Sequence, residues 1–116
     1  SWVEDMRVIP ITSTAAPTAS EKLQDLITTV DLFIPASLTG SSVKADVAAT
    51  AQTDFLLKDD GATVATIRFA ASGTTASFES VSSGTIAAGS RITIESPGTP
   101  DATLASIYGG LHLFKR

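Results

Sequence analysis

The stretch Thr53–Ala70, TDFLLKDDGATVATIRFA, decides the fold of this chain. On each side of Asp59-Asp60-Gly61, apolar residues alternate with polar or small ones, which is the pattern of a half-buried β-strand. The Asp-Gly pair supplies the positive φ angles that a tight hairpin turn requires. We therefore expect a β-hairpin whose inward-facing residues are Phe55, Leu57, Ala65, Ile67 and Phe69.

The same pattern continues on both sides of this hairpin. Turn residues recur roughly every 8–12 residues, and no long helical segment separates the strands, so an antiparallel sheet is favoured over a parallel one. Gly109-Gly110 interrupts the last strand and indicates a bulge or a close backbone approach. The sequence predicts a single antiparallel β-sandwich or jelly-roll domain over residues 28–116, with further strands at 29–35, 42–48, 75–79, 91–95 and 104–114 and a run at 85–89 that leads into a turn.

The first 27 residues fit this pattern less well. Pro10 confines the β-rich run of residues 2–12 to a sheet edge or an extended arm. Residues 13–20 have the composition of a linker, and Ser20–Leu23 begins like a capped helix but is followed at once by β-branched residues. We expect residues 1–27 to form an extended N-terminal arm and linker, with a helical turn at most or the entry to a strand near its end.

Composition excludes several functional classes. The chain has no Cys and one His, so thiolate chemistry and multi-histidine metal sites are ruled out. Its net charge of −4, with scattered basic residues, argues against a nucleic-acid partner. No apolar run approaches the length of a membrane span, so membrane insertion is not expected.

Residues 31–116 resemble a β-sandwich module of bacteriophage tail-fibre, tail-spike and head-fibre proteins. Ser90 stands where that module more often has Asp. The resemblance rests on the order and spacing of six elements, which are Leu32–Pro35, Gly40-Ser41, Phe55–Gly61, Thr66–Ala70, Ala88–Ile94 and Pro100–Ile107.

This resemblance implies a non-enzymatic virion structural protein. It implies a homotrimer that is assembled in the host cytoplasm, exposed on the particle surface, and engaged in host-surface attachment or particle assembly. The implied partners are other virion proteins and a host cell-surface glycan or protein, and no cofactor, metal or catalytic residue is implied. Two alternatives remain open: a capsid-decoration or head-fibre protein that binds only virion proteins, and a carbohydrate-binding accessory module.

Three residues or motifs could carry chemistry, and each has a structural interpretation that we favour. His112 lies opposite Leu111 and Leu113 on the last strand and is expected to have a structural or surface role, with an interface pH sensor as the alternative. Asp59–Gly61 could begin a calcium site but is better explained as a turn. Asp101, after Pro100, is expected to cap a turn.

The apolar residues near both chain ends need to be covered by other protein. Trp2 and Tyr108 are the best candidates for exposed aromatic side chains, which could stack on sugar rings or, for Trp2, anchor a neighbouring subunit. We expect the subunit interface to include Trp2, Val8, Ile9, Ile11 and Phe114.

Overall fold

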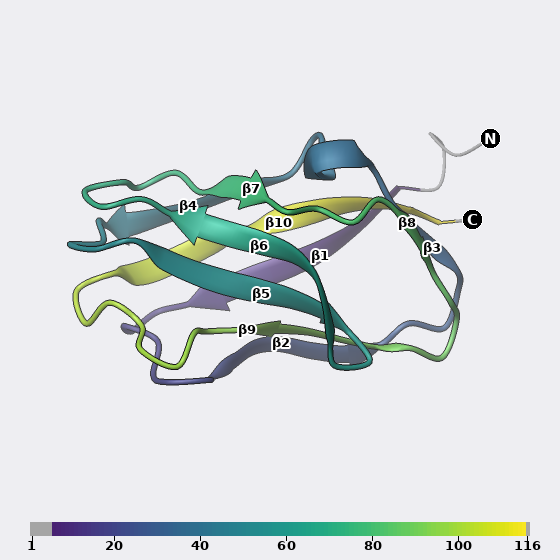
Figure 1. The fold of residues 1–116 in the computed structure, drawn as a ribbon, viewed down its shortest axis with the longest axis horizontal. Coiled ribbons are helices and arrows are strands. Elements are labelled where there is room, and N and C mark those ends of the chain that lie inside the picture. Colours follow the sequence, from purple (N-terminus) through teal and green to yellow (C-terminus); the bar gives the residue numbers. More distant parts are fainter. Residues whose placement is uncertain (1–5, 116) are drawn as a thin grey trace.

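The computed structural model describes residues 6–115, and nearly all regular structure in them is β (Figure 1). A short 3-10 helix, Ala36–Leu38, separates two of the strands. The strands are β1 (Met6–Ser13), β2 (Lys22–Ile27), β3 (Leu32–Ile34), β4 (Ser42–Val47), β5 (Thr53–Asp59), β6 (Ala62–Phe69), β7 (Ser77–Glu79), β8 (Gly84–Ile86), β9 (Arg91–Glu95) and β10 (Ala105–Lys115).

The strand pairs are nested around the Asp60-Gly61 turn like the two arms of one long hairpin. β5 pairs with β6, a bridge from Lys44 to Thr75 joins β4 to the segment before β7, and β3 pairs with β8. β2 then pairs with β9 and β1 with β10, and every pair is antiparallel. The positive φ angles at Asp60 (49°) and Gly61 (88°) are those of the predicted tight turn.

This long hairpin is wound into two packed sheets. The first, sheet A, has the order β1-β10-β3-β8, and β4 also pairs with β10; the second, sheet B, has the order β2-β9-β5-β6-β7. A nested antiparallel hairpin wound into two sheets is a jelly roll. The predicted all-β, antiparallel sandwich is therefore confirmed.

Residues 6–27 do not form the predicted arm. β1 pairs with β10 from Met6↔Phe114 to Ser13↔Ile107, and β2 pairs with β9, so both strands belong to the sandwich. β1 is an edge strand, where the missing N–H of Pro10 costs no ladder hydrogen bond. The predicted domain boundary after residue 27 is therefore wrong. The helical turn, one of the two structures expected near Ser20, is also wrong.

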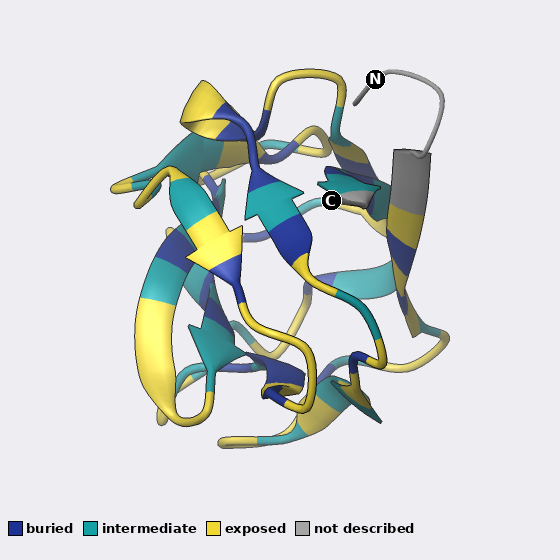
Figure 2. Cartoon of the chain, turned by 90° about the vertical axis from the view of Figure 1, so that its right-hand side faces the viewer, coloured by how far each residue is buried: buried dark blue, intermediate teal, exposed yellow. Residues whose placement is uncertain are grey.

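The core lies between the sheets, and buried and exposed residues alternate along the strands (Figure 2). Phe55 and Phe69 are fully buried and meet edge to face, with ring centroids 6.0 Å apart. The five inward-facing residues predicted for the central hairpin, which are Phe55, Leu57, Ala65, Ile67 and Phe69, are all 0% exposed.

Candidate functional site

The structure divides the predicted interface residues between two sides of sheet A. Ile9 and Ile11 are 4% and 1% exposed and lie in the chain's own core, so they are not available to another subunit. Val8 alternates with them, faces outward and is 59% exposed. Phe114 also lies on the outer side and is half-buried, while Trp2 lies outside the described residues.

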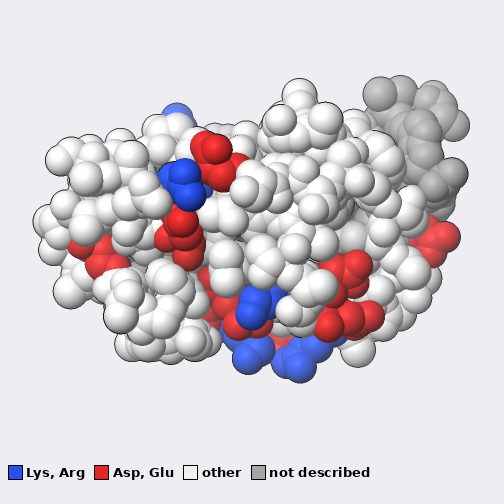
Figure 3. Space-filling model, viewed as in Figure 1, with Lys and Arg blue, Asp and Glu red and all other residues white. Residues whose placement is uncertain are grey.

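The outer side of sheet B carries charged side chains (Figure 3), six of which form three ion pairs within the chain. Ion pairs connect neighbouring strands across it, and the hydrogen bond from Arg91 lowers the pKa of Asp25. Because these charges already have partners and face solvent, we interpret this side as a solvated surface. The ion pairs are Asp25–Arg91 at 2.7 Å, Lys58–Glu95 at 3.3 Å and Asp54–Arg68 at 2.9 Å.

The outer side of sheet A is almost uncharged. Among the described side chains of its strands, Lys44 and Asp46 are the only charged ones, and both lie on β4. Apolar and aromatic residues gather instead where β1, β10 and β3 run side by side: Val8 is opposite His112, and Phe114 is opposite Phe33. We call Val8, Phe33, His112 and Phe114 the aromatic patch.

His112 is built into this patch. Its ring lies 4.9 Å from that of Phe114, centroid to centroid, and Gly40 lies so close over it that a Cβ there would come within 3.1 Å of its Cγ. The backbone N–H of His112 donates to Ser41 Oγ at 2.7 Å, and its Nε2 is buried without a hydrogen-bond partner. This packing fits the expected structural role better than the work of a general base, which needs its ring nitrogen to reach a substrate.

The apolar surface continues around the open side of the sandwich. β1 and β2 are the edge strands of the two sheets, and an apolar hollow of about 220 Å³ lies between them. Val8, Leu26 and Ile27 line it, and Ile27 is 65% exposed. Val8 and Ile27 thus expose apolar side chains on the two neighbouring edge strands.

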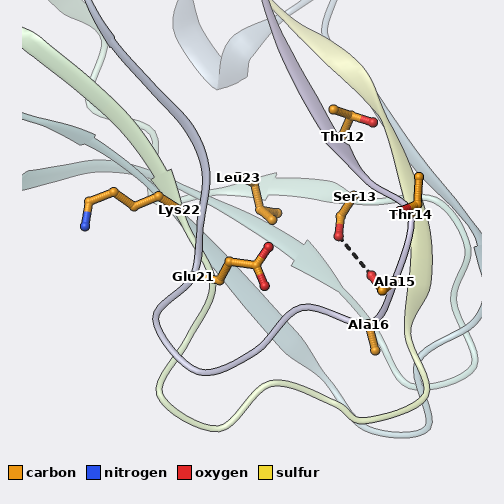
Figure 4. Close-up of a pocket in the computed structure, with 8 residues that line it drawn as sticks. All are labelled: Thr12, Ser13, Thr14, Ala15, Ala16, Glu21, Lys22 and Leu23. Atoms are coloured by element: carbon orange, nitrogen blue, oxygen red, sulfur yellow. Dashed lines mark hydrogen bonds between the residues drawn. The ribbon is translucent and has the colours of Figure 1, made fainter.

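A second kind of surface occupies the opposite end of sheet A. A hollow of about 250 Å³, which we call the hydroxyl hollow, is lined by Thr12, Ser13, Thr14, Asp46, Ser106, Ile107 and Tyr108. It shares Thr12–Thr14 with a hollow of about 370 Å³ that reaches Glu21, Lys22 and Leu23 (Figure 4). In Figure 4 the Glu21 carboxylate turns toward the Ser13 side, whereas Lys22 points away. Tyr108 is 47% exposed, as expected for a free aromatic.

The remaining candidates have structural roles. Asp60 forms the hairpin turn and accepts a hydrogen bond from the Arg91 N–H at 2.8 Å. Asp101 caps its turn by accepting from the N–H groups of Thr103 and Leu104, both at 2.9 Å. It also accepts from the Thr50 hydroxyl at 2.5 Å, and this hydrogen bond above all lowers the pKa of Asp101 well below its usual range.

The hydroxyl hollow is not visible as a motif in the sequence. Its residues come from three separate strands and from the loop after β1, and only the fold brings them together. Thr12 becomes the neighbour of Tyr108 only through the pairing of β1 with β10. That pairing could have been found from the sequence by extending the hairpin register outward from Asp60-Gly61.

Among residues 6–115, no helix is long and apolar enough to cross a membrane, and no three His, Cys, Asp or Glu residues gather in a way that could hold a metal ion. Comparison with protein-family models, curated proteins and solved structures found no match to the chain.

Proposed function

We propose that this chain is a non-enzymatic structural module of a bacteriophage particle, a tail-fibre or tail-spike component that acts as a homotrimer in host-surface attachment or particle assembly. Its place is the surface of the virion, and its partners are further copies of itself, other virion proteins and a host-surface receptor. The virion setting and the threefold state derive from the resemblance of residues 31–116 to phage fibre and spike modules.

The observation that carries the proposal is the contrast between the two outer faces of the sandwich. Sheet B presents paired charges, whose removal from water would be costly. Sheet A presents the aromatic patch, whose four residues include no Lys, Arg, Asp or Glu, so another copy that covers them buries no such charge among them. The occupant we assign to the aromatic patch is therefore a second copy of this chain.

The geometry of the patch supports a role in assembly rather than catalysis. Val8 lies next to the apolar hollow between β1 and β2, so patch and hollow form one continuous surface around the sheet edge. Contact along this surface would also cover the open edge of β1, which otherwise exposes unpaired backbone groups.

Light scattering after size-exclusion chromatography tests the proposal. The wild-type chain should elute with three times the mass of one chain. Val8→Lys places a charge in the patch and loses the burial of one Val, which is worth about 1.5–3 kcal/mol, so it should shift the chain to monomer. Thr63→Lys makes a similar change at an exposed position on sheet B and should leave the trimer intact.

Two outcomes of the light-scattering experiment would reject the proposal. A wild-type chain that is monomeric at every concentration contradicts it, and so does a Val8→Lys chain that remains trimeric. Far-UV circular dichroism of both variants checks that the sandwich is still folded.

A further inference from the structure

We propose that the hydroxyl hollow binds a neutral saccharide, with the Tyr108 ring as the stacking surface. This inference deepens the proposed function by naming the chemical class of the surface to which the module attaches. It rests on that function only for its biological setting, because the hollow belongs to a single chain.

The hollow and the aromatic patch lie at different ends of the same strand. On β10, Tyr108 is four residues from His112, the nearest patch residue, and six from Phe114, or roughly 13 Å and 20 Å at a rise of about 3.3 Å per residue. Contact confined to the patch would therefore leave Tyr108 uncovered. The structure thus separates a surface for assembly from a surface for a ligand.

Three polar side chains of the hollow are free to bind, whereas the Ser13 and Ser106 hydroxyls donate to the backbone carbonyls of Ala15 and Thr14. Within the described part of the chain, the side-chain oxygens of Thr12, Asp46 and Tyr108 have no hydrogen-bond partner. Thr12 lies directly opposite Tyr108 on β1, and Lys44 lies directly opposite it on β4, so polar groups flank the ring on both sides. Asp46 and Ser106 add a carboxylate and a hydroxyl to the same wall.

This combination matches the chemistry of a sugar ring. The C–H face of a pyranose is apolar and packs on an aromatic ring, while its hydroxyls donate to a carboxylate and exchange hydrogen bonds with Thr and Ser. The hollow provides both kinds of contact: the exposed Tyr108 ring for stacking, and one carboxylate and several hydroxyls for hydrogen bonds.

The charges beside the hollow balance each other, because Asp46 lines it and Lys44 lies directly opposite Tyr108 on the same strand as Asp46. Glu21 turns toward the adjoining hollow, whereas the cationic group of Lys22 points away (Figure 4). The Glu21 carboxylate already accepts hydrogen bonds from the Thr18 N–H and hydroxyl, so a sulfated or phosphorylated ligand would meet one carboxylate and one ammonium group at the hollow and find no cluster of cations. The neutral saccharide is the class that the arrangement favours.

Titration of the isotope-labelled full chain, followed by two-dimensional NMR of the backbone amides, tests this assignment. The probes are oligomers of glucose, oligomers of N-acetylglucosamine, lactose, and dextran sulfate as the anionic comparison. We expect a neutral probe to shift amide signals at residues 12–14, 44–46 and 106–108, and dextran sulfate to leave them unchanged.

Variants separate stacking from general surface effects. Tyr108→Ala should weaken binding at least about tenfold because the stacking ring is lost, whereas Tyr108→Phe should retain most of the affinity. Thr63→Ala alters an exposed side chain on sheet B, outside both the hollow and the assembly surface, and should bind like the wild type.

Several outcomes would overturn the assignment: no neutral probe shifting these amides, shifts elsewhere in the chain, preference for dextran sulfate, or unchanged binding by Tyr108→Ala. A trimer that binds none of the neutral probes would reject the saccharide site and leave the assembly proposal standing. A monomer that binds a neutral probe at Tyr108 would reject the assembly proposal and leave the saccharide site standing.

Discussion

Replacing Gly109 with Ala should destabilise the sandwich more than the same change at Gly84. Both glycines have a φ of 152°, a conformation that side chains rarely adopt, so each replacement introduces similar backbone strain of about 1–3 kcal/mol. At Gly84 a Cβ would meet nothing within 4 Å. At Gly109 it would press on the Ser42 carbonyl and come within 2.6 Å of Val43 Cα, so β4 would have to move.

The difference between the two variants isolates this close approach. Forcing extra volume into a packed region costs about 1–3 kcal/mol, so Gly109→Ala should lose about 2–6 kcal/mol in all, against about 1–3 kcal/mol for Gly84→Ala. Urea unfolding followed by far-UV circular dichroism measures both losses. If Gly109→Ala fails to fold while Gly84→Ala folds, the result has the predicted sign.

One result would refute this reasoning: free energies of unfolding for the two variants that agree within about 0.5 kcal/mol, the scatter of neutral substitutions. The backbone of β10 would then have room to accept a side chain beside β4. The hydroxyl hollow depends on the same contact, because it draws Asp46 from β4 and Tyr108 from β10. We therefore also expect Gly109→Ala to weaken saccharide binding, and Gly84→Ala to leave it unchanged.

Two further substitutions test the core and the C-terminal turn. Phe55→Ala empties a site that is 0% exposed and removes the edge-to-face contact with Phe69. Urea unfolding should therefore show that the free energy of unfolding falls by about 3–5 kcal/mol. A fall of less than about 1 kcal/mol would contradict the core described here. The lowered pKa of Asp101 stabilises the fold above the ordinary pKa of Asp, about 3.9, and this contribution is lost as the pH falls below that value. Urea midpoints measured from pH 6 to pH 2 should therefore fall more steeply for the wild type than for Asp101→Asn, and parallel curves would contradict the assignment.

The alternation of apolar and polar residues in the sequence predicted the central hairpin, β5 and β6, correctly. The alternation on both sides of Asp60-Gly61 depends only on neighbouring residues, and the turn needs positive φ angles that Gly provides. The close approach expected at Gly109-Gly110 has a similar local origin, since glycine in a strand often marks a place where no side chain fits.

The chain ends were harder to predict because their environment comes from distant residues. Ile9 and Ile11 appear in the sequence as uncovered apolar surface, and only the pairing of β1 with β10 places them in the core. Ser20–Leu23 begins like a capped helix, but pairing of the following residues with β9 overrides this local preference. The aromatic patch and the hydroxyl hollow are equally non-local, since each needs three strands in register.

The central claim, that copies of this chain cover the outer side of sheet A at the aromatic patch, is tested most directly by thiol labelling. The chain has no Cys, so Val8→Cys and Thr63→Cys each introduce a single thiol, on sheet A and sheet B respectively. We predict that a maleimide reagent labels Thr63→Cys rapidly in the native state, and that Val8→Cys is protected until denaturant separates the subunits. Equal labelling rates for the two native proteins would contradict the claim.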